Sequence, residues 1–468
     1  MKEFNVLQKS LAKRVVNENK GRYFYKNAAT DCILIHNVPY IFTCNNDDKL
    51  TIFKNYSILV KKGIIKKLLP SSEFNPDDFD LVYNAGKKGG VVITPGLVNT
   101  HAHPPMYLMR SIMTLEEGEG LKDTIEAMPK WERLMNDEDI AVGSLGDITE
   151  QQRYGITSTL SHYGVFEPID FAASLTRHNL INALSAVSNT HPENSPEMIE
   201  DLLKRKKTYS KPGVALHYLY KADDKTLGKI RDLVRKHSIL FTCHMAESED
   251  VAQECQRKRK AREVTLLARH GLLNKNSILS HSIALKDHEI KRIVEAGAGI
   301  SHLPTSNTIH KSGRFPFWKF YDYGGFPRIA LGTDGVVSKC RVDVLSEAYQ
   351  TRITHIYERS VKFGSLFKMA TANGARILGF DNRGKILPGY NADLAIWKLN
   401  DISCIPFDEN NPITLISNLI THGGRPVRDL MINGEFIIKN RQHQFVNESS
   451  LLRNMQKSHM QMRKRVSD

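Results

Sequence analysis

The 468-residue sequence lacks the features of secreted and membrane proteins. No apolar run approaches the ~20 residues that a membrane-spanning helix needs. The first ten residues, MKEFNVLQKS, contain no uninterrupted apolar segment of the kind found in a secretory signal. The six cysteines include no Cys-x-x-Cys pair and are too sparse for a disulfide framework, which indicates free thiols in a reducing compartment. We therefore expect a cytoplasmic protein without a membrane partner.

Several catalytic and binding motifs are also missing. The chain has neither the His-Glu-x-x-His of zinc proteases nor the Pro-Cys-x-x-Cys of cytidine-deaminase-like proteins. It has no P-loop and no Gly-x-Gly-x-x-Gly segment, so no nucleotide cofactor is expected. The net charge is +14, but the lysines and arginines are scattered and no aromatic residues are interleaved with them in a nucleic-acid-binding motif. Solvated helix faces explain this charge better than a nucleic-acid partner does.

A short apolar run followed by a longer amphipathic stretch recurs eight times between residue 91 and about residue 334. The apolar runs span residues 91–98, 155–161, 179–187, 214–220, 239–243, 277–280, 298–303 and 328–332. Helix-like stretches lie between them at 137–153, 196–207, 225–237, 250–270 and 286–295. Strands and helices that alternate in this way predict parallel βα units, and eight units predict a closed (β/α)8 barrel, also called a TIM barrel.

The two flanks of this region have a different pattern. Segments 33–69 and 392–438 resemble short strands joined by turns, and neither flank alone has enough strands to bury one face. We therefore predict a small β-sandwich domain built from both chain ends. The predicted parts are an N-terminal extension (1–30), a composite β-sandwich domain (31–90 with 380–446), the barrel (91–379) and a basic C-terminal tail (447–468).

Histidine or aspartate ends or interrupts most of the predicted barrel strands. These residues are His101, His103, His217, His244, His281, His302 and Asp334, and Glu247 follows His244 by three positions. His101 and His103 leave the same face of their strand, because side chains at positions i and i+2 do so. A lone strand-end histidine is more often structural. However, the loops of a barrel converge at the C-terminal ends of its strands, so the joint pattern predicts a metal and catalytic site there.

Five segments, in this order, resemble the amidohydrolase superfamily. They are PGLVNTHAH (95–103), HMAE (244–247), SH (280–281), SHLPTSN (301–307) and LGTDG (331–335). The resemblance runs from about residue 31 to 440 and includes ATANGA (370–375) and KILPGYNADL (385–394). Within the superfamily, the sequence is most similar to the branch of methylthioadenosine/S-adenosylhomocysteine deaminase, guanine deaminase and triazine chlorohydrolase-like enzymes.

The resemblance implies a metal-dependent hydrolase. The residues implied to hold one divalent cation are His101, His103, His244 and Asp334. Three imidazoles and a carboxylate suit Zn²⁺ or Fe²⁺. The implied reaction is hydrolytic deamination of a nitrogen heterocycle, such as a purine, pyrimidine, pterin or triazine, by hydroxide attack on a ring carbon. The enzyme would thus cleave a non-peptide carbon–nitrogen bond of a small-molecule substrate, and family analogy suggests a homodimer or a larger homo-oligomer.

The resemblance also implies roles for individual side chains. Glu247 is expected to protonate the ring nitrogen, Asp334 to pass the proton of water to the leaving group, and His281 to orient the hydroxide. The residues expected to contact substrate are His217, His302, Ser306 and Asn307. The histidines interpreted as structural or surface residues are His162, His288 and His310.

Alternatives remain open for the metal count, the leaving group and catalysis itself. Lys221 could carry a carboxylate that bridges a second metal, but Lys-Ala-Asp-Asp resembles a solvated loop, and we expect one metal. Residues 108–117 depart from the Arg-Gly and Leu-x-x-Trp pattern of adenosine-type deaminases, so a dehalogenase or another amidohydrolase of a heterocycle fits as well. A non-catalytic scaffold is the third alternative, although it would have no chemical reason to keep every ligand.

The two carboxylates also have non-catalytic explanations. Glu247 begins a helix-like acidic stretch, where the helix dipole alone favours a negative charge. Asp334 precedes Gly335 and could be an ordinary turn residue. The spacing of Glu247 from His244 and the place of Asp334 after the eighth run favour the functional interpretation.

Overall fold

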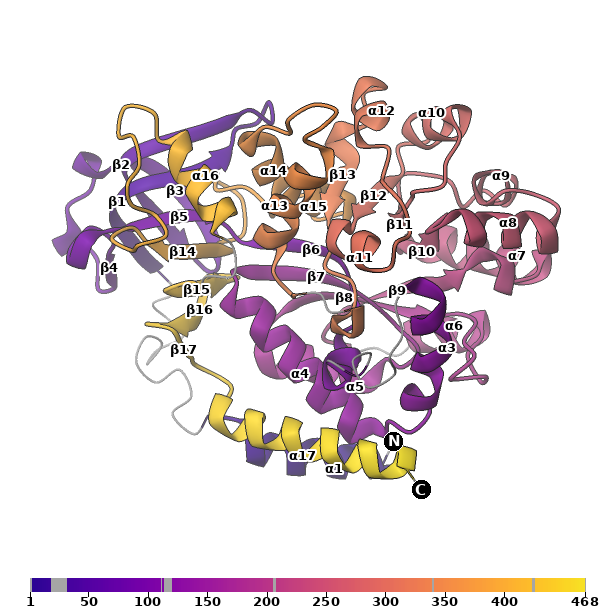
Figure 1. The fold of residues 1–468 in the computed structure, drawn as a ribbon. Coiled ribbons are helices and arrows are strands. Elements are labelled where there is room, and N and C mark those ends of the chain that lie inside the picture. Colours follow the sequence, from indigo (N-terminus) through magenta and orange to yellow (C-terminus); the bar gives the residue numbers. More distant parts are fainter. Residues whose placement is uncertain are drawn as a thin grey trace.

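The structure is a computed structural model that describes residues 2–17, 32–110, 112, 120–204, 208–338, 341–422 and 426–467. These residues form two sheets, and most of the helices lie around the eight-stranded sheet (Figure 1). Within the described ranges, no helix combines the length and the apolar character needed to cross a bilayer. The five described cysteines are free, as predicted, and Cys340 lies outside the described residues.

The eight-stranded sheet is the predicted TIM barrel. Its strands are neighbours in chain order: β6 (Leu97–Ala102), β7 (Ile156–Tyr163), β8 (Asn179–Ser185), β9 (Lys211–Tyr218), β10 (Phe241–Met245), β11 (Ser277–His281), β12 (Gly299–His302) and β13 (Ile329–Leu331). Neighbouring strands along this order pair in parallel. The last strand meets the first where Ala102 pairs with Asp334, and the Asp334 amide donates to the His101 carbonyl at 3.0 Å. The barrel is therefore closed beside two of the predicted metal ligands.

Helices follow the barrel strands as predicted. They are α4 (Asp137–Arg153), α5 (Glu167–Thr176), α6 (Pro196–Lys204), α7 (Asp224–His237), α8 (Glu249–Arg259), α9 (Glu263–Arg269), α10 (Asp287–Glu295), α11 (Pro304–Ile309), α12 (Phe317–Asp322), α13 (Val344–His355), α14 (Phe363–Ala370) and α15 (Ala372–Ile377). The stretch 250–270, predicted as one helix, is divided into α8 and α9. Lys260 ends α8 in the left-handed conformation, with φ of +53°, and an α-helix cannot continue through it.

The run 91–98, predicted as one barrel strand, is also divided. Val91–Pro95 forms β5, which pairs with β1 and β14 of the other sheet, whereas Leu97 begins the barrel strand β6. Gly96 lies between them against β7, where a Cβ atom would lie 2.1 Å from the Thr157 hydroxyl oxygen. The chain therefore passes from one sheet to the other at a residue that has no side chain.

The second sheet combines both ends of the chain, as predicted for the small β-sandwich domain. Its strands are β1 (Cys32–Cys44), β2 (Leu50–Lys61), β3 (Ile64–Pro70), β4 (Val82–Asn84), β5, β14 (Leu394–Lys398), β15 (Asp429–Ile432), β16 (Glu435–Lys439) and β17 (Gln442–His443). The order is β17-β16-β15-β14-β5-β1-β2-β3, with β4 on β1. Ile35 and Ile58 from one flank share a core with Leu394 and Phe436 from the other.

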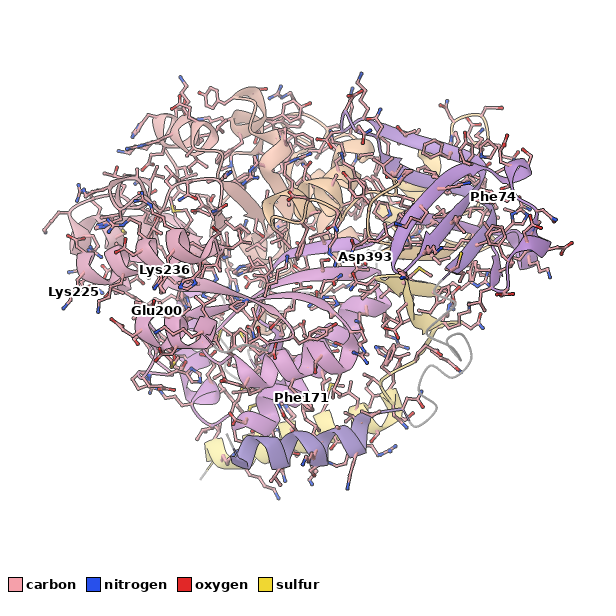
Figure 2. All side chains as sticks on the ribbon, turned by 180° about the vertical axis from the view of Figure 1, so that it is seen from behind. Phe74, Phe171, Glu200, Lys225, Lys236 and Asp393 are labelled. Carbon is pink, nitrogen blue, oxygen red and sulfur yellow. The ribbon has the colours of Figure 1, made fainter. Side chains whose placement is uncertain are left out.

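A buried carboxylate connects the two domains. Asp393, at the junction of sheet and barrel in Figure 2, accepts hydrogen bonds from Asn179 Nδ2 of β8 (3.1 Å) and from the Asn433 amide (2.7 Å), and it pairs with Arg383. Each oxygen of Asp393 is therefore bonded to a different part of the chain. This arrangement fixes the β-sandwich domain against the barrel at the start of β8.

The terminal segments are helical. α1 (Lys2–Val15) and α17 (Glu448–Ser467) lie side by side along α4, and the two chain ends meet (Figure 1). Leu11 of α1 and Met462 of α17 are buried in one apolar cluster with Ile140 and Leu145 of α4. The segment predicted as a basic tail therefore packs as a helix, while residues 18–31 of the predicted N-terminal region lie outside the described residues.

Candidate metal centre and active site

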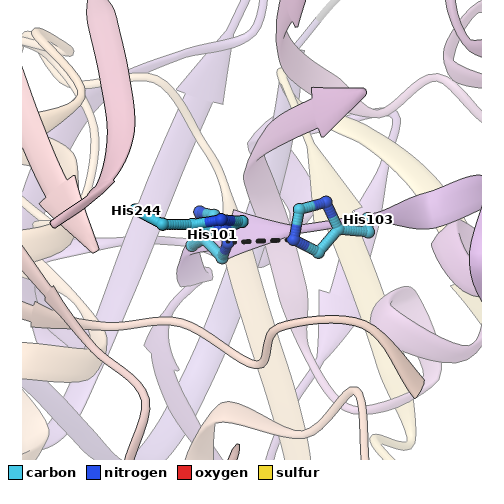
Figure 3. A group of neighbouring side chains, drawn as sticks. All are labelled: His101, His103 and His244. Carbon is cyan, nitrogen blue, oxygen red and sulfur yellow. Dashed lines mark hydrogen bonds between the residues drawn. The ribbon is translucent and has the colours of Figure 1, made fainter. Parts of the chain in front are cut away.

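Three histidine side chains meet at the C-terminal end of the barrel (Figure 3). His101 Nε2 lies 3.1 Å from His103 Nε2 and 3.0 Å from His244 Nε2, and all three residues are buried. Ligand atoms held at 2.0–2.1 Å from one tetrahedral ion are ~3.3 Å apart. The three imidazoles can therefore bind a single metal ion without rearrangement.

Asp334 brings a carboxylate to the same place. Its Oδ1 lies 3.2 Å from His103 Nε2 and 3.8 Å from His101 Nε2. The Ser306 hydroxyl donates to Oδ2 at 2.5 Å, and the Gly335 amide donates to Oδ1 at 2.8 Å. These bonds fix the carboxylate with one oxygen toward the imidazoles, so nitrogen and oxygen donors of the kind that Zn²⁺ or Fe²⁺ accepts are gathered at one point.

The outer ring nitrogens of two of the histidines are held by hydrogen bonds. His101 Nδ1 lies 2.9 Å from the Ser280 hydroxyl oxygen, and His103 Nδ1 donates to the His162 carbonyl at 2.6 Å. A proton on Nδ1 leaves the Nε2 lone pair free for a metal, and such partners also fix the plane of the ring. His244 Nδ1 is buried without a hydrogen-bond partner among the described residues.

The directions of the pKa shifts suit metal binding at His101, His244 and Asp334, whereas His103 is shifted in the opposite direction. Burial, assisted by neighbouring imidazoles, lowers the pKa of His101 and of His244 well below the ordinary value. Burial also acts to lower the pKa of His103, but the hydrogen bond and the charge of Asp334 outweigh it, so that pKa is raised. The hydrogen bond and the charge of His103 overcome burial to hold the pKa of Asp334 well below its usual range. Neutral imidazoles beside an ionised carboxylate are the forms that coordinate metals.

Replacing Ser280 with alanine is expected to weaken metal binding by about 10- to 100-fold, because His101 loses the partner that orients its ring. The affinity for Zn²⁺ is measured by competition with a chromogenic chelator. Ser277→Ala is the matched control, since Ser277 is also buried on β11 but donates to the Leu272 carbonyl, away from the cluster. Equal affinities of Ser280→Ala and Ser277→Ala would contradict the prediction.

A second chain of contacts begins beside the cluster formed by His101, His103 and His244. The Tyr218 hydroxyl donates to Glu247 Oε2 at 2.7 Å, and Glu247 Oε1 lies 3.6 Å from His281 Nε2. His281 Nδ1 lies 2.8 Å from Asn307 Oδ1. Burial and the charge of Glu247 raise the pKa of Tyr218 well above its ordinary value, so this tyrosine stays a donor. Glu247 and His281 are thereby held in fixed orientations next to each other.

The backbone at the site is strained. His281 and Asp334 both adopt positive φ, +64° and +62°, although neither is glycine. Such a conformation costs about 1–3 kcal/mol per residue and persists where the surrounding structure imposes it. The Asp334 amide donates a hydrogen bond to the His101 carbonyl, and Asn307 holds the side chain of His281 by a hydrogen bond. The strain therefore falls on two residues with predicted catalytic roles.

A cavity opens onto these groups. From the barrel its lining includes His103, His162, His217, Tyr218, His244, Glu247, His281 and Asp334. The helix α3 (Leu121–Glu132) adds Leu121, Ile125 and Met128, which supply an apolar wall. A cavity with an apolar wall and a floor of imidazole and carboxylate groups suits a flat polar ring.

The predicted substrate contacts are only partly at the cavity. His217 lines it. Ser306 and Asn307 are not part of the lining and bond instead to the side chains of Asp334 and His281, which makes them positioning residues in this geometry. His302 is fully buried against Phe315, with ring centroids 4.8 Å apart, and lies outside the lining, so its role as a substrate contact stays a prediction.

Sequence reasoning also missed residues that the structure places at the site. His162, interpreted as structural, ends β7 and lines the cavity, so the rule used for the other strand-end histidines would have found it. His310, given the same interpretation, lines the cavity as well. Nothing in the sequence pattern identified Tyr218 or Glu132, because each reaches the cavity only when distant segments of the chain fold together. Of the departing loop 108–117, residues 111 and 113–117 lie outside the described residues.

His302 and His355 are expected to make the protein less stable in acid. The rings are buried, with centroids 5.5 Å apart, and their nitrogens have no hydrogen-bond partner among the described residues. Burial lowers the pKa of His302 well below its ordinary value and that of His355 to about 4. The unfolded chain therefore binds more protons as the pH falls from 6.5 toward 4, and His355 alone removes about 3 kcal/mol of unfolding free energy over that range.

Urea unfolding at pH 7, 6, 5 and 4 measures this effect, with His355→Phe as the comparison. Phenylalanine fits beside Phe317, on which His355 already stacks with ring centroids 5.1 Å apart. The variant should lose less unfolding free energy between pH 6 and pH 4 than the parent. Parallel pH curves for the two proteins would be inconsistent with a buried, neutral His355.

Comparison with known proteins places this geometry in a family. The model of the amidohydrolase family matches residues 92–437, which is most of the barrel and the C-terminal strands. The chain belongs to the amidohydrolase family. This membership agrees with the barrel, the composite β-sandwich domain and the His101–His103–His244 cluster.

Relatives of this amidohydrolase extend over nearly the whole chain. A 5-methylthioadenosine/S-adenosylhomocysteine deaminase from Pyrococcus furiosus is 28% identical over 421 residues, covering 86% of this chain and 96% of that protein. A 5'-deoxyadenosine deaminase from Methanosphaera stadtmanae is 27% identical and covers 85% of this chain and 93% of that protein. The solved structure of an adenosine deaminase from Xanthomonas campestris with bound zinc matches with a TM-score of 0.82 at 23% identity, over 92% and 98% of the two chains. That structural likeness shows the shared fold.

Proposed function

We propose that this amidohydrolase is a hydrolytic deaminase of an amino-substituted nitrogen heterocycle, with adenine nucleosides as the first candidates. The observation that carries the proposal is that Glu247, held by Tyr218 and adjacent to His281, faces the same cavity as the histidine cluster. Deamination of a ring carbon needs a proton for the ring nitrogen and an activated water on one side of the ring. The deaminase names of the two sequence relatives support this choice.

We infer one divalent cation per chain, Zn²⁺ or Fe²⁺, held by His101, His103, His244 and Asp334. The three histidines offer ring nitrogens close to one another, and Asp334 Oδ1 lies 3.2 Å from His103 Nε2. The hydrogen bonds on the outer nitrogens of His101 and His103 leave their inner lone pairs available. When bound, such an ion supplies the positive charge that lowers the pKa of a water to about 7. Metal analysis by plasma mass spectrometry is expected to give one equivalent, and two equivalents would favour the Lys221-bridged alternative.

The chain's own carboxylates then move the protons. The Asp334 carboxylate, held in place by Ser306 and the Gly335 amide, accepts the proton of the attacking water and passes it to the leaving amino group. Glu247 delivers a proton to the ring nitrogen next to the carbon under attack, and it regains a proton from the added hydroxyl group as the ring carbonyl forms. The Tyr218 bond holds the Glu247 oxygen that does not face His281. As an imidazolium, His281 donates Nδ1–H to Asn307 Oδ1 and Nε2–H toward the developing oxyanion.

The test is a screen of amino-purines and their nucleosides, amino-pyrimidines, pterins and triazines, read by ammonia release and by the ultraviolet shift of the ring. Chloro-substituted triazines with chloride detection form a separate arm for the dehalogenase alternative. Ammonia release from at least one amino-heterocycle supports the proposal. Chloride release without ammonia release, or no turnover of any compound by metal-loaded protein, would refute it.

We further infer that the protein forms a homo-oligomer. Tyr349 and Ile353 of α13, with Ile356 and Tyr357 just beyond it, expose large apolar side chains, and Tyr357 is 92% exposed. A group of such side chains on one helix is a feature of protein interfaces. Sedimentation velocity of the purified protein distinguishes a dimer or larger assembly from a monomer, which would contradict this inference.

A further inference from the structure

The cavity contains a cation that the proposed reaction does not use. Lys221 ends the short 3-10 helix Leu219–Lys221, directly after β9, and its side chain lines the cavity with His217 and Glu247. Its Nζ lies 5.6 Å from the centre of the Tyr218 ring. Of the residues that the structure describes, none places a carboxylate oxygen within the 4.0 Å of an ion pair to this Nζ. Among the described residues, the ammonium group of this cavity-lining lysine therefore has no bonded counter-ion.

The surroundings of Lys221 favour an anion in that space. Burial lowers the pKa of Lys221, which reflects the cost of a charge removed from water. The hydroxyl oxygens of Ser188 and Thr190 lie 3.1 Å apart and line the same cavity, so they add neutral donors. A second cation, Lys258, lies over Tyr220, which stacks on Tyr218, but its charge is balanced by Glu254 at 2.9 Å. A partly buried cation, such as Lys221, gains from a ligand that supplies the opposite charge.

We propose that Lys221 is a specificity-determining residue that pairs with an anionic substituent, a carboxylate or a phosphate, on the heterocyclic substrate. This inference rests on the proposed function, since the ring itself must lie at the histidine end of the cavity. The enzyme then binds anionic derivatives of a given ring more tightly than neutral ones. A single ammonium group can accept either anion, because it acts as a point charge rather than a shaped fork.

A structural role for Lys221 makes a different prediction. Glu132, the last residue of α3, also lines the cavity, and its charge acts on Lys221. If Lys221 only balances Glu132, removing its charge disturbs the wall of the cavity for every ligand. The two roles are therefore separated by comparing neutral and anionic ligands that share one ring.

The experiment measures binding of ligands that cannot be deaminated. Three inosine derivatives serve as probes in calorimetry: 5'-methylthioinosine (neutral), 5'-carboxymethylthioinosine (carboxylate) and inosine 5'-monophosphate (phosphate). The parent protein is expected to bind at least one anionic probe more tightly than the neutral one. Lys221→Met should raise the Kd of that probe by about 10- to 100-fold, the range for a hydrogen bond to a charged group, and leave the neutral probe within about twofold. Whichever anionic probe loses affinity in Lys221→Met shows whether Lys221 recognises a carboxylate or a phosphate.

Two variants serve as matched controls. Lys221→Arg keeps the charge and should retain most of the preference for the anion. Lys258→Met removes a cation from the same aromatic stack, but Lys258 is not part of the cavity lining and pairs with Glu254 at 2.9 Å, so binding of each probe should stay close to that of the parent.

Three results would overturn the proposal: no preference of the parent for either anionic probe, no change in Lys221→Met, or an equal loss of neutral and anionic probes in that variant. Failure of the proposed function is read separately, as the absence of ammonia release from amino-heterocycles. Because the probes have no amino group on the ring, the two failures cannot be confused.

Discussion

Replacing His101 with alanine is expected to reduce the rate of ammonia release by at least about a thousandfold. Loss of a residue that only hydrogen-bonds to a metal ligand already lowers metal affinity or activity by about 10- to 100-fold, and loss of the ligand itself should cost more. His101 is central to the cluster, with Nε2 atoms of His103 and His244 at 3.1 and 3.0 Å. Its loss removes the ring nitrogen that lies close to both other imidazoles, so the remaining donors hold the ion less tightly. Turnover under saturating Zn²⁺ and bound metal after gel filtration are the two measurements, and both should fall together.

His302→Leu is the matched control for this loss. His302 is also a fully buried histidine at the end of a barrel strand, but it packs against Phe315 and His355 rather than in the cavity. The variant should keep its bound metal, and kcat should remain within a few-fold of the parent. Retention of metal and activity by His101→Ala would mean that the cluster is not the catalytic centre.

Replacing Glu247 with glutamine is expected to lower kcat by about a hundred- to ten-thousandfold, the range for loss of a general acid or base. Glutamine keeps the shape and can still accept the bond from the Tyr218 hydroxyl, so the cavity should remain intact. Because Glu247 is outside the metal-binding group, the metal content should stay unchanged. Steady-state kinetics with metal analysis of the same sample test this prediction, and a full loss of metal would show that Glu247 has a structural role.

Tyr218→Phe provides a graded comparison with Glu247→Gln. It removes one hydrogen bond to a charged group, so the expected decrease in kcat is about tenfold or somewhat more. The ring also supports the stack on Tyr220, and phenylalanine preserves that contact. A loss in Tyr218→Phe as large as that in Glu247→Gln would indicate that the tyrosine hydroxyl, and not the carboxylate, takes part in proton transfer.

The fold was predictable where apolar periodicity was strong. The helix Asp137–Arg153 and seven of the eight barrel strands, all except β6, follow directly from runs whose length and pattern fit one element. Two divisions were not predictable, because each depends on backbone conformation or on a distant neighbour. Lys260 ends α8 in the left-handed conformation, and Gly96 is required by the approach of Thr157. Neither feature changes the hydrophobic pattern along the chain.

The site was predictable in its strand-end histidines and acids but not in its partners. The histidine cluster forms because the C-terminal ends of the strands meet at one end of any such barrel. The side chains that orient it, such as Ser280 and Tyr218, are common residue types with no spacing signature, and only the folded distances identify them. His302 packs against Phe315 outside the cavity lining, since a strand-end position does not reveal whether a side chain points to the cavity or away from it.

The place where the barrel closes has a consequence for its stability. His101 and His103 belong to the first strand, and Asp334 follows the last strand, so a cation bound by all three joins the two edges of the barrel. Withdrawal of that ion by a chelator removes a cross-link between residues more than two hundred positions apart in sequence. Because a ligand that binds only the native state stabilises it, the melting temperature should rise with free Zn²⁺, and the earliest loss of protection from hydrogen exchange in chelated protein should occur in β6 and β13.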